Sequence, residues 1–297
     1  MGFGRGHLDW ARDGADWPNR EASRFVRAAG LTWHVQRMGA GPTVLLIHGT
    51  GGATHSWRGV APLLAERFDV IAPDLPGHAF TPAPRQSALS LPNMASGLGA
   101  LLAALEAEPA IVVGHSAGAA IAARMALDGA AAPSAIVSFN GAFLPFRGLA
   151  GQLFPSMAKL LALNPFAPRA FAWSADRIAV ERIAVAIGSP LGREGAGWYR
   201  RLLASPSHIS GMLGMMAFWD LKPLMRDLAR LQPHLELVVG ETDRAVPPSD
   251  AREIAARAPR CHVTPLPGLG HLAHEERPDL AADIVVRVAS EVSGLQL

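Results

Sequence analysis

Short apolar runs recur along the chain, and each stops at a glycine, a proline, an asparagine or a histidine. Such runs are typical of parallel strands that are buried on both faces of a sheet. We therefore expect core strands at residues 43–47, 68–72, 110–113, 135–139, 235–239 and 262–266. Residues 24–36 predict two further short strands around a glycine turn.

Stretches with a helical spacing of apolar residues, or with strong helix formers, lie between these strands. They cover residues 56–66, 93–106, 117–128, 248–258 and 277–292. The alternation of strand and helix predicts an α/β sheet with helices on both faces. Ligands bind beyond the carboxyl ends of the strands in open sheets of this kind, so we expect the loops after the strands to carry the chemistry.

One long segment, residues 142–225, interrupts the alternation because it contains no clear strand and is rich in Leu, Met, Phe, Trp and Pro. We expect it to form a helical cap inserted over the strand ends. Residues 1–141 and 226–297 would then form the α/β core.

The chain has no apolar stretch of about 18 residues that could span a membrane, and its N-terminal region lacks the apolar core of a signal peptide.

The composition narrows the classes of function. Hydrophobic residues make up 49% of the chain and charged residues 18%, which is typical of a globular protein. The net charge is only +2 and the arginines are scattered, so we do not expect nucleic acid as a partner. The single cysteine cannot form an internal disulfide, which favours a reducing, cytoplasmic compartment. The high apolar content leaves a peripheral contact with a membrane open.

Residues 114–118, Gly-His-Ser-Ala-Gly, match the G-x-S-x-G pattern of a nucleophile elbow. The pattern needs small residues two positions from the serine because the turn from strand to helix is sharp. A strand-like run precedes Ser116 and a helix-like run follows it. We therefore predict that Ser116 is a nucleophile and that the backbone N–H of Ala117 faces the developing oxyanion. A glycine-serine turn without chemistry is the alternative.

A second glycine-rich turn, His48-Gly49-Thr50-Gly51-Gly52, follows the first core strand. It predicts the rest of an oxyanion hole, with Thr50 as the second donor and Gly51 close by. A phosphate-binding loop is excluded because no G-x-x-x-x-G-K-[ST] pattern occurs, and a dinucleotide loop is excluded because Thr54 occupies the third glycine position. Asp74, in the turn after the next strand, is expected to be structural and to satisfy backbone donors near this loop.

The acid is expected at the end of a strand on the far side of the insertion. Asp243 follows the run 235–239 and lies between the serine and the last histidines, in the chain order Ser, Asp, His. An acid there can orient a histidine and stabilise its cation. A turn-forming aspartate is the alternative. The competing acid position, at the end of run 135–139, holds Asn140, which carries no charge.

The base is expected after the last strand, where the turn Gly268-Leu269-Gly270 presents His271. We predict that His271 is the general base. His274, at the start of the next helix, is the rival. A metal site at this H-x-x-H-E sequence is a weaker interpretation because no third ligand is in view, and we expect no metal and no cofactor.

These motifs, in this order, resemble the α/β-hydrolase fold over nearly the whole chain. A narrower resemblance lies in DWPNR at residues 16–20, SRFV at 23–26, LTWHVQ at 31–36, HGTGGATHSWR at 48–58 and APDLPGHAFT at 72–81. These segments resemble the magnesium-chelatase accessory proteins of bacteriochlorophyll biosynthesis, also called the 30 kDa chelatase subunit. The resemblance implies a role at the insertion of Mg²⁺ into protoporphyrin IX, with chelatase subunits as partners.

Three functions stay open from the sequence. The chain lacks a phosphate-binding loop, so it is not the ATP-driven motor of a chelatase, and no carboxylate cluster suggests a dedicated Mg²⁺ site. It is therefore expected to be an accessory protein that keeps a serine-hydrolase site. The alternatives are a carboxylesterase or C–C bond hydrolase of an apolar substrate, and a porphyrin-binding protein whose triad is idle.

The insertion carries methionine and aromatic side chains that suit a flat, apolar ligand such as protoporphyrin IX or its Mg form. Most of them should form the insertion's own small core. The residues expected to line the cleft are Phe143, Met212, Met215, Met216, Phe218 and Trp219. The residues expected at its rim, where they can meet propionate groups, are Arg147, Arg169, Arg177 and Arg182.

Overall fold

The computed structural model describes residues 6–84, 86–145, 159–161, 164, 166–174 and 180–293. An eight-stranded sheet lies at its centre, with the strand order β1-β2-β4-β3-β5-β6-β7-β8. The strands are β1 (Ser23–Ala28), β2 (Leu31–Met38), β3 (Thr43–Ile47), β4 (Asp69–Pro73), β5 (Pro109–His115), β6 (Ala135–Phe139), β7 (His234–Gly240) and β8 (Cys261–Leu266). The β1–β2 and β2–β4 pairs are antiparallel, and the pairs from β4 to β8 are parallel.

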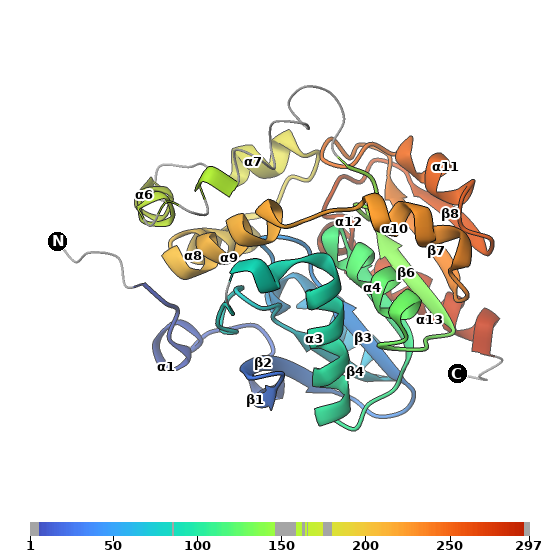
Figure 1. Ribbon diagram of the computed structural model, residues 1–297, viewed down its shortest axis with the longest axis horizontal. Coiled ribbons are helices and arrows are strands. Elements are labelled where there is room, and N and C mark those ends of the chain that lie inside the picture. Colours follow the sequence, from blue (N-terminus) through green and yellow to red (C-terminus); the bar gives the residue numbers. More distant parts are fainter. Residues whose placement is uncertain are drawn as a thin grey trace.

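Both faces of the sheet are covered by helices, as the apolar runs predict (Figure 1). In β3, Leu45 and Ile47 belong to one buried cluster, and Val44 and Leu46 belong to the other. The first cluster includes residues of α3 (Leu91–Ala104), α4 (Ala117–Asp128) and α11 (Asp250–Ala255). The second includes residues of α2 (Val60–Leu64) and α13 (Pro278–Ser293). Successive side chains of a strand point to opposite faces of the sheet. A strand that is apolar throughout therefore contributes to the core on each face.

The helix expected at residues 56–66 is divided. The chain forms a 3₁₀ turn, η2 (Thr54–Trp57), and then the shorter α2, with Gly59 between them. A Cβ on Gly59 would lie 2.8 Å from Cβ of Pro278, at the start of α13. The close approach of a helix that is distant in sequence therefore requires a glycine where the local pattern favours helix.

Only helices occur among the described residues between β6 and β7, apart from turns and loops. The α-helices with defined bounds are α6 (Ala167–Ser174), α7 (Val180–Ala186), α8 (Arg193–Leu203), α9 (Pro206–Ala217) and α10 (Lys222–Asp227), and residues 159–161 are also helical. Helices α6 to α9 lie together on one side of the molecule, at the upper left of Figure 1. That the segment 142–225 acts as a separate cap stays a prediction. Within the described ranges, none of the helices combines the length and hydrophobicity that a bilayer span requires.

Candidate active site

Ser116 lies at the turn from β5 to α4, with φ 50° and ψ −116°. A positive φ is uncommon for a residue with a side chain and costs on the order of 1–3 kcal/mol, so its surroundings must hold it. The Ser116 N–H donates to the carbonyl of Phe139 at 3.0 Å, and the Ser116 carbonyl accepts from Ala119 and Ala142 at 3.1 and 3.0 Å. The backbone is therefore fixed on both sides in the conformation that a nucleophile elbow requires.

The glycines around Ser116 are required by close backbone contacts. A Cβ on Gly114 would overlap the backbone of Ala119, and a Cβ on Gly118 would overlap the carbonyl of Ile47. A Cβ on Gly49 would lie 3.0 Å from Cβ of Ser116. The glycine-rich loop after β3 therefore passes directly beside the serine.

Asp243 and His271 lie together, with His271 Nδ1 2.8 Å from Asp243 Oδ2. Both side chains are buried. The other carboxylate oxygen of Asp243 accepts the backbone N–H groups of Ala245 and Val246 at 2.7 and 2.9 Å. An acceptor fixed in this way holds the proton of His271 on Nδ1, which leaves Nε2 free to accept a proton.

His271 also contacts the elbow through the residue that precedes the serine. The His115 ring N–H donates from Nε2 to the carbonyl of His271 at 2.9 Å, and the two ring centroids are 4.8 Å apart. Burial lowers the pKa of His115 well below its ordinary value, so this imidazole is neutral. The pair formed by Asp243 and His271 is thereby tied to the turn that carries Ser116.

His274, the rival base, lies in the core. Its ring packs 4.5 Å from Trp57 and 4.4 Å from His115, centroid to centroid, and neither ring nitrogen has a hydrogen-bond partner in the described part of the chain. Burial lowers its pKa to about 3. These contacts suit a neutral packing histidine.

The loop that carries Thr50 is a tight turn, in which the Gly52 N–H donates to the carbonyl of Gly49 at 3.0 Å. The side chain of His48 links this loop to the loop after β4. Its Nδ1 donates to the Gly49 carbonyl at 2.8 Å, and its Nε2 accepts the N–H of Leu75 at 2.9 Å. The Thr50 hydroxyl donates to the sulfur of Met215 at 3.4 Å.

Asp74 has the contacts expected of a structural residue. It is fully buried, accepts the N–H groups of Thr54 and Phe80 at 2.8 and 3.2 Å, and lies 2.7 Å from Nδ1 of His34. Its burial by itself would raise the pKa of the carboxyl, but the charge and hydrogen bond of His34 outweigh it and hold the pKa at about 2. The charged carboxylate ties the loop after β4 to the loop after β3.

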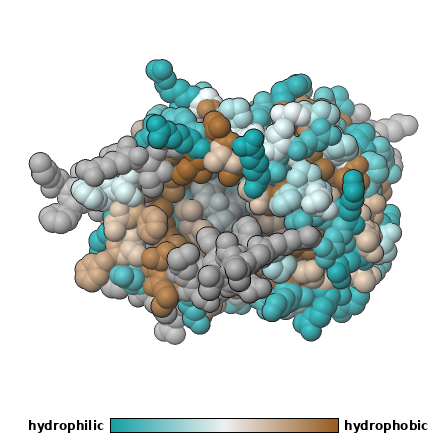
Figure 2. Space-filling view, turned by 90° about the horizontal axis from the view of Figure 1, so that it is seen from above, coloured by the Kyte–Doolittle hydropathy of each residue, from teal (hydrophilic) through white to brown (hydrophobic). Residues whose placement is uncertain are grey.

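The residues expected to line the ligand cleft divide into two groups. Phe143 and Met215 are fully buried in the core cluster that covers α3 and α4. The half-buried members are Met212, Met216, Phe218 and Trp219. The space-filling view from above shows a hollow, and hydrophobic side chains form part of its rim (Figure 2).

Two of the arginines expected at the rim, Arg169 on α6 and Arg182 on α7, have exposed side chains. Arg147 and Arg177 lie outside the described residues. Whether any of them meets a ligand stays a prediction.

Sequence reasoning missed two residues that hold the site. Asn140 donates from its side-chain amide to Asp243 Oδ2 at 2.7 Å. Ser189, after α7, accepts the N–H of Leu272 at 2.7 Å and donates to Glu276 at 2.6 Å, and Glu276 also accepts the N–H of Gly270 at 3.0 Å. The position of Asn140 at the end of β6, beside β7, was a usable signal, whereas nothing in the sequence distinguishes Ser189.

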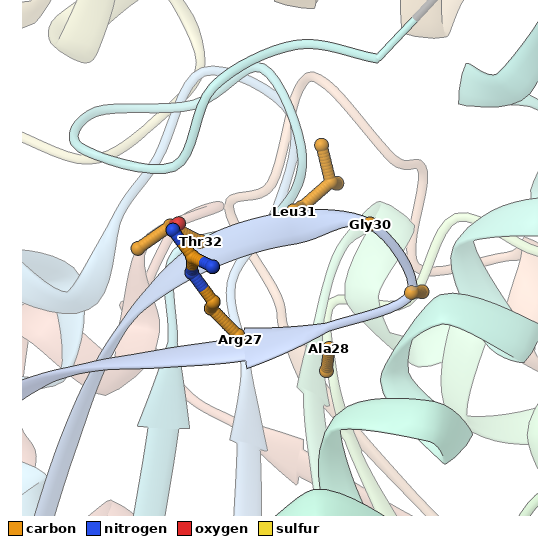
Figure 3. A pocket seen from close by; sticks show the side chains of 6 residues that line it. Arg27, Ala28, Gly30, Leu31 and Thr32 are labelled. Atoms are coloured by element: carbon orange, nitrogen blue, oxygen red, sulfur yellow. The ribbon is translucent and has the colours of Figure 1, made fainter.

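A second hollow lies at the turn between β1 and β2 (Figure 3). It is lined by a single turn of chain, residues 27–32, and its polar side chains are Arg27 and Thr32. These lining residues include neither an acid nor a histidine that could activate the Thr32 hydroxyl. Among the described residues, no group of three or more His, Cys, Asp or Glu side chains can hold a metal ion.

A family model for the alpha/beta hydrolase family matches residues 44–284. The chain therefore belongs to the alpha/beta hydrolase family. It is also 38% identical over 268 residues to the magnesium-chelatase 30 kDa subunit of Rhodobacter capsulatus, covering 89% of this chain and 93% of that protein. The expected fold and the expected resemblance to this subunit are both confirmed.

Solved structures agree on the fold. The epoxide hydrolase CorEH has a TM-score of 0.79 at 20% identity, covering 91% of this chain and 98% of its own. A putative lipase, lip1, from Acinetobacter baumannii AYE has a TM-score of 0.76 at 19% identity, covering 92% of each chain. At these identities the likeness shows the fold alone.

Proposed function

We propose that this protein is an accessory protein of bacteriochlorophyll biosynthesis, acts at the insertion of Mg²⁺ into protoporphyrin IX, and keeps a serine-hydrolase site. The observation that carries the first part is the 38% identity to the magnesium-chelatase 30 kDa subunit over 89% of the chain. The second part is supported by the strained backbone of Ser116 and by the hydrogen bond of 2.8 Å between His271 and Asp243.

In this proposal the site cleaves an ester or a related acyl bond. Ser116 Oγ attacks the carbonyl carbon while His271 Nε2 takes its proton, and Asp243 stabilises the resulting imidazolium. The N–H groups of Thr50 and Ala117 stabilise the oxyanion, with Gly51 close by. His271 then returns the proton to the leaving group, and water releases the acyl group from the serine by the same steps in reverse.

The proposed ligand is broad, flat and apolar. Met212 and Met216 on α9, and Phe218 and Trp219 just after it, are half-buried, and Met212 lies against Gly51. Methionine side chains can adapt to a flat apolar surface. Protoporphyrin IX or its Mg form fits this chemistry and the relation to a chelatase subunit. We expect the purified protein to bind protoporphyrin IX at about micromolar strength, on the order of −8 kcal/mol. Tryptophan quenching and a shift of the Soret band on titration would measure it.

Two other functions would each need only one of these two features, the triad or the apolar lining. A carboxylesterase or C–C bond hydrolase would need the triad but no porphyrin. A porphyrin-binding protein would need the apolar lining but no reactive serine. Magnesium chelatase subunits as direct partners, and a peripheral membrane contact, belong to the first and third functions.

The deciding experiment is the pigment profile of a phototrophic host deleted for this gene and complemented with wild type or Ser116→Ala. We expect the deletion to accumulate protoporphyrin IX and the wild-type gene to restore bacteriochlorophyll. Restoration by Ser116→Ala would favour a binding role over hydrolysis. A deletion strain with an unchanged pigment profile would contradict the accessory role and favour the esterase.

A further inference from the structure

One face of helix α9 packs directly on the loops that follow β3 and β4. The residues on this face, which we call the stripe, are His208, Gly211, Met212 and Met215. They are three or four positions apart, as neighbours on one side of a helix are. A Cβ on Gly51 would lie 2.9 Å from Cε of Met212. A Cβ on Gly211 would overlap the carbonyl of Gly77, so the helix and the loop touch through their backbones.

Within the described part of the chain, His208 is the one residue of the stripe whose side chain forms hydrogen bonds with backbone groups of the two loops. The backbone N–H of Ala79 donates to His208 Nδ1 at 3.0 Å. Because Nδ1 accepts, the ring proton lies on Nε2, which donates to the carbonyl of Gly51 at 3.2 Å. The side chain is fully buried, and its burial lowers the pKa to about 4, so the neutral ring that these two bonds need is the form present near neutral pH.

The Gly51 carbonyl belongs to the peptide unit that closes the loop. A peptide unit is planar, so its C=O and the N–H of the next residue turn together. In this unit the C=O accepts from His208, and the Gly52 N–H donates to Gly49 at 3.0 Å. Gly51 has a φ of +79° and no Cβ, so its own backbone restricts the unit little. The bond from His208 therefore acts together with the internal bond of Gly52 to fix the orientation of this peptide unit.

We propose that His208 is a positioning residue that orients the oxyanion loop through its bond from Nε2 to Gly51, and so holds the N–H of Thr50 toward the reacting carbonyl. The proposal rests on the serine-hydrolase site proposed above. Under this proposal α9 has two roles. It supplies apolar side chains to the proposed ligand, and through His208 it orients the loop beside Ser116.

A matched pair of substitutions separates this role from simple packing. Glutamine places an amide N–H where Nε2 lies, so His208→Gln can keep the bond to Gly51 and loses the acceptor for Ala79. Asparagine places a carbonyl where Nδ1 lies, so His208→Asn can keep the acceptor for Ala79 and loses the bond to Gly51. Thermal melting of both variants establishes that each is folded.

The first measurement is labelling by a fluorophosphonate probe, resolved into the limiting rate and the probe concentration at half-maximal rate. We expect His208→Asn to lower the limiting rate on the order of tenfold or more, below the roughly 10²–10³-fold cost of deleting an oxyanion donor. His208→Gln should restore most of the rate, and the half-maximal concentration should change little in both. Equal limiting rates for wild type and His208→Asn would overturn the proposal.

The second measurement does not depend on a reactive serine. Hydrogen exchange of the Gly52 amide, followed by NMR, reports whether the turn stays closed. We expect faster exchange in His208→Asn than in His208→Gln, with the amides of β5 unchanged in both. Equal Gly52 exchange in the two variants would overturn the positioning role. Failure of the wild type to label, with this exchange difference present, would contradict the hydrolase site and leave the positioning role supported.

Discussion

The carboxylate of Asp243 bridges two side chains through one oxygen, since Oδ2 lies 2.8 Å from His271 Nδ1 and 2.7 Å from the amide nitrogen of Asn140. An amide in place of this carboxylate would favour the wrong tautomer of His271. We therefore expect Asp243→Asn to keep its melting temperature within a few degrees and to lower the rate of fluorophosphonate labelling by about 10⁴-fold. A labelling rate within threefold of wild type would contradict the role of Asp243.

The two candidate histidines should respond differently to substitution. His271→Ala removes the proposed base, so labelling should fall to the level of Ser116→Ala. His274→Ala removes a ring that packs against Trp57 and should lower the melting temperature while the folded protein still labels. Loss of labelling in folded His274→Ala alone would show that we have chosen the wrong base.

The Ser189 hydroxyl, in the segment after α7, accepts a hydrogen bond from the loop that carries His271. Replacing Ser189 should therefore disturb the position of His271. Ser189→Ala leaves the buried N–H of Leu272 without its acceptor, which costs on the order of 1–3 kcal/mol. We expect a lower free energy of unfolding and a lower limiting labelling rate. Ser290→Ala is the matched control, because that hydroxyl donates only to a carbonyl within α13, and it should change neither quantity. Parallel behaviour of the two variants would argue against a supporting role for Ser189.

The stability of the loops after β3 and β4 should depend on pH, because the carboxylate of Asp74 links the two loops. Its pKa is about 2 in the folded chain, below its ordinary value of 3.8, so the carboxylate stabilises the fold at any pH above about 4. That contribution is lost as the pH falls toward 2. Asp74→Asn should therefore be less stable than wild type at pH 7, and chemical denaturation should show the difference shrinking between pH 4 and pH 2. A constant difference over that range would be inconsistent with this linkage.

Much of the fold could be predicted because its signals are local. The strands at residues 43–47 and 135–139 and the helix at 117–128 have the predicted bounds, since each is an apolar or helix-forming run with a clear stop. The division of the expected helix at residues 56–66 was missed. The glycine between its two parts, Gly59, is explained by the approach of the distant Pro278, which no local pattern reveals.

The supporting contacts of the site could not be predicted for the same reason. Asn140 reaches Asp243 across 103 positions, Ser189 reaches Leu272 across 83, and His208 reaches Gly51 across 157. No local period or motif encodes such pairs. They follow only once the sheet order and the placement of α9 are known.

Ser116 as a reactive nucleophile is the central claim, and one labelling measurement tests it most directly. Purified wild type and Ser116→Ala are treated with a fluorophosphonate probe, and the adduct is located by peptide mass spectrometry. We predict one adduct on wild type, at Ser116, and none on the folded Ser116→Ala variant. Equal labelling of the two proteins, or a folded wild type that does not label, would contradict the claim.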